Sequence, residues 1–174
     1  MPSLSLLAAL AAASPPSFDD QPLPHPTWAW LATQLAPSSE WQLGDEGGFA
    51  LHWQLTPLSY AWGIDRRLNR LRTLVVEPYA RYGGSVELYG VAGLRLTGDT
   101  HSLFRAGVRA YWPLVGRGEY LSFSAGASYQ RWGEHNQVAF ESGIYVLFGI
   151  LGLQASYLPV GPTRSAISVR LRYF

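Results

Sequence analysis

The sequence predicts an all-β fold: a closed antiparallel up-and-down transmembrane β-barrel of about eight strands, preceded by a signal peptide and a short linker. From residue 49 to residue 174, apolar residues alternate with small or polar ones, which is typical of strands with two chemically different faces. Most alternating segments have about 9 to 13 residues, the length that a tilted strand needs to cross a bilayer. Charged residues make up only 14% of the chain, against about 25% in an average soluble domain.

The composition also excludes several classes of function. The chain has 174 residues and no break in composition, which favours a single domain. Its net charge of +1 gives no basic face of the kind that binds nucleic acid, so no nucleic-acid partner is expected. There is no Cys, which excludes disulfides, thiol catalysis and Cys-based metal sites.

The N-terminus has the pattern of a signal peptide over residues 1–14. Residues 4–13 form an apolar run that is too short to span a bilayer as a helix. The run ends in Ala12, Ala13 and Ser14, small residues of the kind that precede a cleavage site, although no Lys or Arg precedes it. A short buried helix is the alternative.

Residues 15–48 are expected to form a periplasmic linker. Residues 18–26 are rich in Pro, and residues 27–35 have the pattern of a short helix with Thr27 as its N-cap and Pro37 beyond its end. A turn is expected at residues 45–48, and residues 49–174 are assigned to the barrel.

The alternation divides the barrel into eight expected strands. They cover residues 49–56, 73–82, 86–95, 104–112, 121–130, 138–148, 151–157 and 167–173. An even number of long antiparallel strands is usual in outer-membrane barrels, and closure removes the unpaired edges that lipid does not tolerate.

The two faces of these strands differ sharply. One face carries Val, Leu, Phe, Ala and Ile at the strand centres and aromatic residues toward the strand ends, as in a lipid-facing surface with aromatic girdles. The opposite face is expected to line the lumen as a charge network of Glu77, Arg81, Glu87, Arg105, Arg109, Glu141, Arg170 and Arg172. Because buried charges need partners, we interpret this set as salt bridges that fill a narrow barrel. In the alternative, a soluble barrel, the faces are reversed and the interior holds an apolar ligand.

A group of Arg residues is expected in the first exterior loop. If the chain enters the barrel from the periplasm, residues 65–71, 97–102, 133–136 and 159–163 face the exterior. The guanidinium fork suits phosphate, so these Arg side chains are expected to contact lipopolysaccharide: Arg66, Arg67, Arg70 and Arg72.

The C-terminal segment carries a family resemblance. Residues 167–174, which read ISVRLRYF and end on Phe174, resemble the last strand of bacterial outer-membrane proteins. Phe174 differs from that pattern because it shares parity with Arg170 and Arg172. The resemblance is to small eight-stranded outer-membrane barrels in general and covers residues 49–174. It implies a location in the bacterial outer membrane, contact with outer-membrane lipid and recognition by the barrel assembly machinery.

The chemistry-bearing residues give no catalytic constellation. The four His residues, His25, His52, His101 and His135, have no second ligand at metal-binding spacing, so neither a metal nor a cofactor is expected. The pair His101–Ser102 lacks the flanking residues of lipid-modifying outer-membrane hydrolases. The expected function is therefore structural, adhesive or envelope-maintaining rather than enzymatic. The alternatives are a narrow channel or carrier for small solutes, a lipid-modifying enzyme and the soluble barrel. The pattern does not indicate how many copies of the chain associate.

Overall fold

The computed structural model describes the barrel and its connections in part. It covers residues 28, 35–45, 47–62, 69–73, 84–97, 101–116, 120–133, 135–147, 150–160 and 163–171. The expected signal peptide lies outside these residues, as does the expected helix at residues 27–35 apart from its residues 28 and 35. Among the residues described, no helix has the length and hydropathy needed to cross a membrane.

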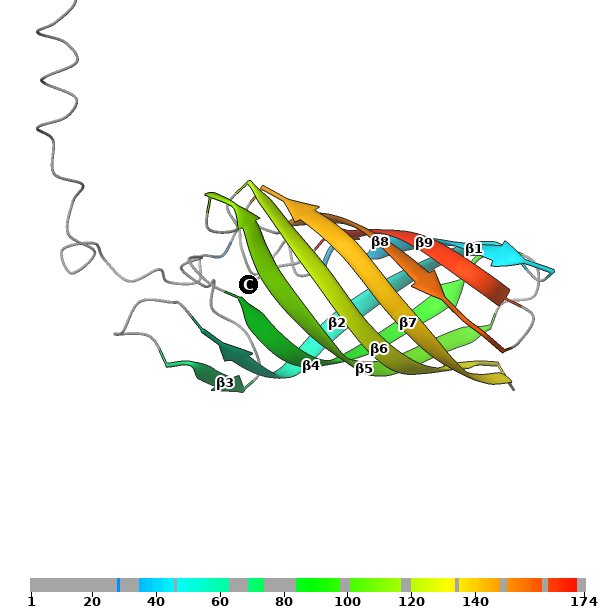
Figure 1. Cartoon of the computed structure of the whole chain (residues 1–174). Coiled ribbons are helices and arrows are strands. Elements are labelled where there is room, and N and C mark those ends of the chain that lie inside the picture. Colours follow the sequence, from blue (N-terminus) through cyan, green and yellow to red (C-terminus); the bar gives the residue numbers. More distant parts are fainter. Residues whose placement is uncertain are drawn as a thin grey trace, which may run out of the picture.

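Eight antiparallel strands close into a barrel (Figure 1). They are β1 (Ser38–Gly44), β2 (Gly48–Ala61), β4 (Ser85–Arg95), β5 (Ser102–Val115), β6 (Leu121–Trp132), β7 (His135–Val146), β8 (Leu151–Tyr157) and β9 (Thr163–Leu171). Each strand pairs with its neighbour along the chain, and β1 closes the barrel by pairing with β9 on one side and β2 on the other. The topology is therefore the up-and-down one that the sequence predicts.

A ninth, short strand extends one edge of the barrel. Strand β3 (Leu71–Thr73) pairs with Leu58–Tyr60 of β2, on the edge of β2 whose other half, Gly48–His52, pairs with β1. The opposite edge of β2 pairs with β4 and contains a register shift between Leu55 and Leu58. Pro57, which has no backbone N–H to donate, lies within this shift.

The strand that closes the barrel differs from the one expected. Part of the range expected as linker, Ser38–Gly44, is strand β1, so the barrel begins before residue 49. Its residues Ser38, Glu40 and Gln42 point inward, and Trp41 and Leu43 point outward. Of the strand expected at residues 73–82, only Thr73 is described, and it belongs to β3. The structure therefore has the predicted number of barrel strands, eight, but β1 takes the place of the strand expected at residues 73–82.

The polar face of the sheet points inward and the apolar face points outward. In β4, for example, Glu87 and Tyr89 are about 1% exposed, while Val86 and Leu88 are 37% and 45% exposed. The same alternation continues through β5, β6, β7, β8 and β9. The two faces are those that the alternation predicts, and the core of this protein is polar.

The added strand β1 also decides which connections share an end of the barrel. The β1–β2, β4–β5, β6–β7 and β8–β9 connections lie at one end, which we call the distal end. The β2–β4, β5–β6 and β7–β8 connections lie at the other, which we call the terminal end because β1 starts and β9 finishes there. The expectation that residues 65–71 share an end with residues 97–102 is wrong for the described residues 69–71, because it placed a barrel strand at residues 73–82, whereas β2 pairs with β4 directly.

Candidate functional site

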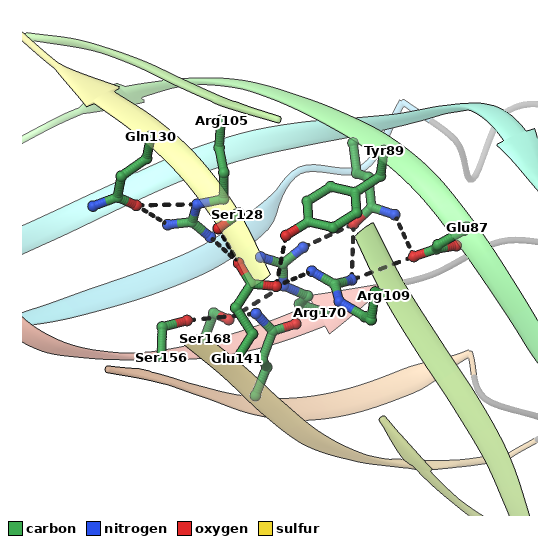
Figure 2. A network of polar contacts seen from close by, with 12 residues as sticks. Glu87, Tyr89, Arg105, Arg109, Ser128, Gln130, Glu141, Ser156, Ser168 and Arg170 are labelled. Carbon is green, nitrogen blue, oxygen red and sulfur yellow. Dashed lines mark hydrogen bonds and ion pairs between the residues drawn. The ribbon is translucent and has the colours of Figure 1, made fainter. Parts of the chain in front are cut away.

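A network of ion pairs crosses the interior of the barrel, and Glu141 of β7 is at its centre (Figure 2). Arg105 and Arg109 are four residues apart on β5, and because strand side chains alternate, both point inward. Arg109 Nη2 lies 2.6 Å from Glu141 Oε2, and Arg105 Nη1 lies 3.7 Å from Glu141 Oε1. These side chains are 0–1% exposed, so the pairs are shielded from solvent.

Two further carboxylates balance the Arg residues. Arg105 Nη2 donates to both oxygens of Glu40, at 3.0 and 3.1 Å, which ties β5 to β1. Arg109 Nη1 lies 3.5 Å from Glu87 Oε1 on the neighbouring strand β4. With the buried Arg170 of β9, the described residues place three carboxylates and three guanidinium groups at the centre of the barrel.

Neutral side chains complete the network. Tyr89 Oη donates to Glu141 Oε2 at 2.6 Å, and Ser128 Oγ donates to the other carboxylate oxygen at 2.9 Å. Gln54 Oε1 accepts from Arg170 Nη1 at 2.8 Å and from Arg109 Nη1 at 3.3 Å. The Glu141 carboxylate therefore accepts from a phenol, a hydroxyl and a guanidinium, which satisfies most of its capacity without water.

Aromatic rings support Arg109. Its guanidinium carbon lies 4.2 Å from the centre of the Tyr89 ring, within the range of a cation–π contact. Its Nη1 also donates to Tyr111 Oη at 3.1 Å, and Tyr111 in turn donates to Glu87 at 3.0 Å. Tyr111 packs edge-on against Tyr145 of β7, with ring centres 5.3 Å apart. The network is thus packed on its terminal side by aromatic rings.

The interior is also packed toward the distal end. Ala50, Leu103 and Trp132 form an apolar cluster there, and each is at most 5% exposed. The Arg95 guanidinium lies 5.6 Å from the Trp132 ring, and its Nη2 donates to the carbonyl of Gly47 at 2.8 Å. Packed side chains therefore occupy the lumen at the distal end as well as at its centre.

His52 is a buried residue of the lumen whose imidazole makes no hydrogen bond among the residues described. It is 0% exposed and points inward from β2, between Ser38 of β1 and Gly93 of β4. Neither ring nitrogen has a hydrogen-bond partner among the residues described. His101 and His135 are exposed near the distal end, and His25 lies outside the described residues.

The structure brings together five of the eight residues predicted for the lumen, namely Glu87, Arg105, Arg109, Glu141 and Arg170. The other three, Glu77, Arg81 and Arg172, lie outside the described residues. Glu40 was missed because its segment was assigned to the linker, although the alternation of Glu40, Trp41, Gln42 and Leu43 is the signal that finds it.

The Arg residues expected to bind lipopolysaccharide form no described cluster. Arg70 is exposed at the terminal end, Arg72 lies in β3, and Arg66 and Arg67 are outside the described residues. The expected location of this group in an exterior loop beside residues 97–102 and 133–136 depended on the barrel strand placed at residues 73–82 and on the omission of β1.

The outer face of the barrel carries a continuous set of large apolar side chains. Trp53, Leu88, Phe104, Val108 and Phe140 are all between 43% and 56% exposed, and they come from four strands. Trp112 and Phe123 stack on this face with ring centres 6.0 Å apart. Comparisons with protein-family models, with curated protein sequences and with solved structures gave no match.

Proposed function

We propose that this chain is a bacterial outer-membrane β-barrel that spans the bilayer and has a structural, adhesive or envelope-maintaining role without catalysis. The observation that carries the proposal is the reversed polarity of the barrel. Its interior contains Glu40, Arg105, Arg109 and Glu141, each at most 4% exposed, while Leu, Val, Phe and Trp side chains cover the outside. In water, such a fold would expose its apolar residues and bury its charges.

The size of the apolar surface supports a lipid environment. Soluble monomers seldom expose contiguous apolar patches of more than a few hundred Å². Here the exposed apolar side chains follow every strand of the barrel, from Trp41 on β1 to Ile167 on β9. The central strands β4, β5, β6 and β7 have 11, 14, 12 and 12 residues, enough to cross a bilayer when tilted.

The packing of the interior favours a structural role over conduction. The side chains of Arg105, Arg109 and Glu141 are 0–1% exposed, so water does not reach them through the lumen. An eight-stranded barrel is just wide enough for side chains to fill its interior. The narrow channel is therefore a weaker candidate than a closed barrel.

A soluble barrel with an apolar ligand inside needs the opposite arrangement of faces. The buried interior positions include Glu40, Gln130, Gln154 and Arg170, which offer an apolar ligand little favourable contact. We therefore do not propose this function.

The first barrel strand, β1, starts on the same side of the membrane as the last, β9, finishes, because the number of barrel strands is even. An exported chain that inserts from the periplasm leaves its terminal end there. The distal end then faces the exterior, and Arg70 faces the periplasm. The proposed partners are therefore outer-membrane lipid, including lipopolysaccharide on the distal side, and the barrel assembly machinery.

The test is to express the full-length chain in a Gram-negative host and analyse washed outer membranes by gel electrophoresis, with and without boiling. The proposal predicts a membrane-retained band whose mobility changes on boiling, as a folded membrane barrel resists the detergent until heated. A chain recovered from the periplasm without detergent, with no change in mobility, would refute it.

A further inference from the structure

A groove of about 640 Å³ lies on the outer face of the barrel, over strands β2, β4, β5 and β6. Its floor consists of small residues, Gly90 and Ala92 on β4 and Ala106 on β5, and Gly90 pairs directly with Ala106. Larger outward residues border the groove: Leu88 precedes Gly90 on β4 by two residues, and Val108 follows Ala106 on β5 by two residues. The groove is therefore a local depression in an otherwise bulky apolar surface.

The walls of the groove are apolar and aromatic. Trp53 and Leu55 of β2 stand on one side, where they pair with Ala92 and Gly90 respectively. Tyr129 of β6 stands on the other side, opposite Ala106. Such walls suit a long, flexible hydrocarbon chain.

The small floor is not required by the packing of the protein itself. A Cβ atom added at Gly90 would meet no neighbouring atom closer than 4.0 Å. The inward-facing Gly93 and Gly107 differ, because a Cβ there would lie within 2.6 and 2.7 Å of backbone oxygens. A glycine inside a strand weakens it and often marks the close approach of another molecule. At Gly90 the space faces outward, where a ligand has access.

A cation lies at the distal end of the same groove. Arg131 is the outward residue that pairs with Phe104, and it lies next to the end of β6. It is exposed, and its Nε donates to the carbonyl of Gly133 at 3.3 Å. An Arg on the outer face near the end of a strand lies at the level of lipid headgroups, where phosphate is the complementary anion.

We propose that this groove is a specific lipid site, which holds one acyl chain of a phosphate-bearing membrane lipid and places its phosphate against Arg131. The inference rests on the proposed function, because it needs the outer face to lie in a bilayer. The acyl chain follows the small floor between Trp53 and Tyr129. The phosphate lies at the distal end, which in the proposed orientation is the side of lipopolysaccharide.

The test is a lipid titration of the full-length protein, extracted from outer membranes in detergent and observed by native mass spectrometry. The probes are dioleoyl phosphatidylglycerol, which is anionic, and dioleoyl phosphatidylcholine, which is zwitterionic. Gly90→Leu fills the groove where the structure has room. Arg131→Gln removes the cation, and Arg164→Gln is its matched control, because Arg164 is exposed on β9 at the same end of the barrel.

We expect Arg131→Gln to weaken the binding of phosphatidylglycerol about fivefold, as loss of one cation near a lipid surface does. Phosphatidylcholine is expected to lose less, because its choline cation already balances the charge of its phosphate. Gly90→Leu is expected to weaken both lipids about tenfold, because several methylene contacts are lost. Arg164→Gln is expected to bind like the wild type.

Equal binding by wild type and Gly90→Leu would overturn the inference, as would equal losses for Arg131→Gln and Arg164→Gln. A wild-type dimer that Gly90→Leu separates, with no change in lipid bound, would assign the groove to a second copy and also overturn it. Each variant is first checked for its mobility change on boiling. If that change is present and the lipid pattern is absent, only the lipid site fails; if the wild type lacks the change, the membrane proposal fails.

Discussion

Arg109 of β5 and Glu141 of β7 form a 2.6 Å ion pair that passes across the intervening strand β6 inside the barrel. Neighbouring strands are already joined by backbone hydrogen bonds, whereas this pair joins strands that are not neighbours. Arg105 and Glu40 do the same between β5 and β1. These contacts across the lumen hold the cross-section of the barrel in one shape.

Glu141→Ala is expected to destabilise the folded barrel by about 3 to 5 kcal/mol, because it leaves buried guanidinium groups without their carboxylate. Urea unfolding of the protein refolded in lipid vesicles measures the change. Asp45→Asn, at an exposed position beside the distal end, is the control and is expected to stay within about 0.5 kcal/mol of wild type. Equal, small effects of both variants would show that the network contributes little.

Gly107→Ala and Gly90→Ala are expected to differ although the two residues lie on adjacent strands. A Cβ at Gly107 would come within 2.7 Å of Ala127 O and 2.8 Å of Tyr89 Oη, so the inward variant is expected to lose about 1 to 3 kcal/mol. Gly90→Ala faces open space and is expected to be neutral or stabilising by up to about 1 kcal/mol. The same urea measurement ranks them, and the reverse order would contradict the assignment of faces.

Val108→Arg is expected to cost about 2 to 4 kcal/mol, the effect of a cation on the lipid face at mid-depth. Leu43→Arg lies near the distal end of β1 and is expected to cost at most about 1 kcal/mol, because the side chain reaches the interface. Both residues are about half exposed, so a soluble barrel would tolerate both changes alike. Indistinguishable stabilities in the vesicle assay would therefore count against a bilayer around the barrel.

Purified protein inserted into planar bilayers is expected to give no resolved ion conductance, because the interior side chains fill the lumen. The measurement is single-channel recording, with a porin as the positive control for insertion. Discrete openings whose conductance changes in Arg105→Gln would contradict the closed interior and favour the narrow channel.

Alternation along the strands was enough to predict which residues face inward. It assigned Glu87, Tyr89, Arg109 and Glu141 to one face without knowledge of their partners. Strand β1 was missed because it is short, follows Pro37 and lies close to a Pro-rich segment that reads as linker. That omission also reversed the end at which Arg70 lies.

The ion pairs between side chains inside the lumen could not be predicted from the sequence. Glu40 and Arg105 are 65 residues apart, and their contact depends on the closure between β1 and β9 rather than on any local pattern. The outer groove was equally hidden, because the small size of Gly90 and Ala106 gains meaning only when the register places them side by side.

The central claim, that the outer face meets lipid, is tested most directly by single-cysteine scanning along β5, which the absence of native Cys makes possible. An environment-sensitive fluorophore is placed at Phe104, Ala106, Val108 and Ala110, and in a separate control variant at the exposed Asp45, with the protein in vesicles that contain spin-labelled lipid. A bilayer around the barrel predicts blue-shifted emission and strong quenching at the four outward positions of β5, with water-like emission and little quenching at Asp45. Water-like emission without quenching at the outward positions, in protein that is folded, would contradict it.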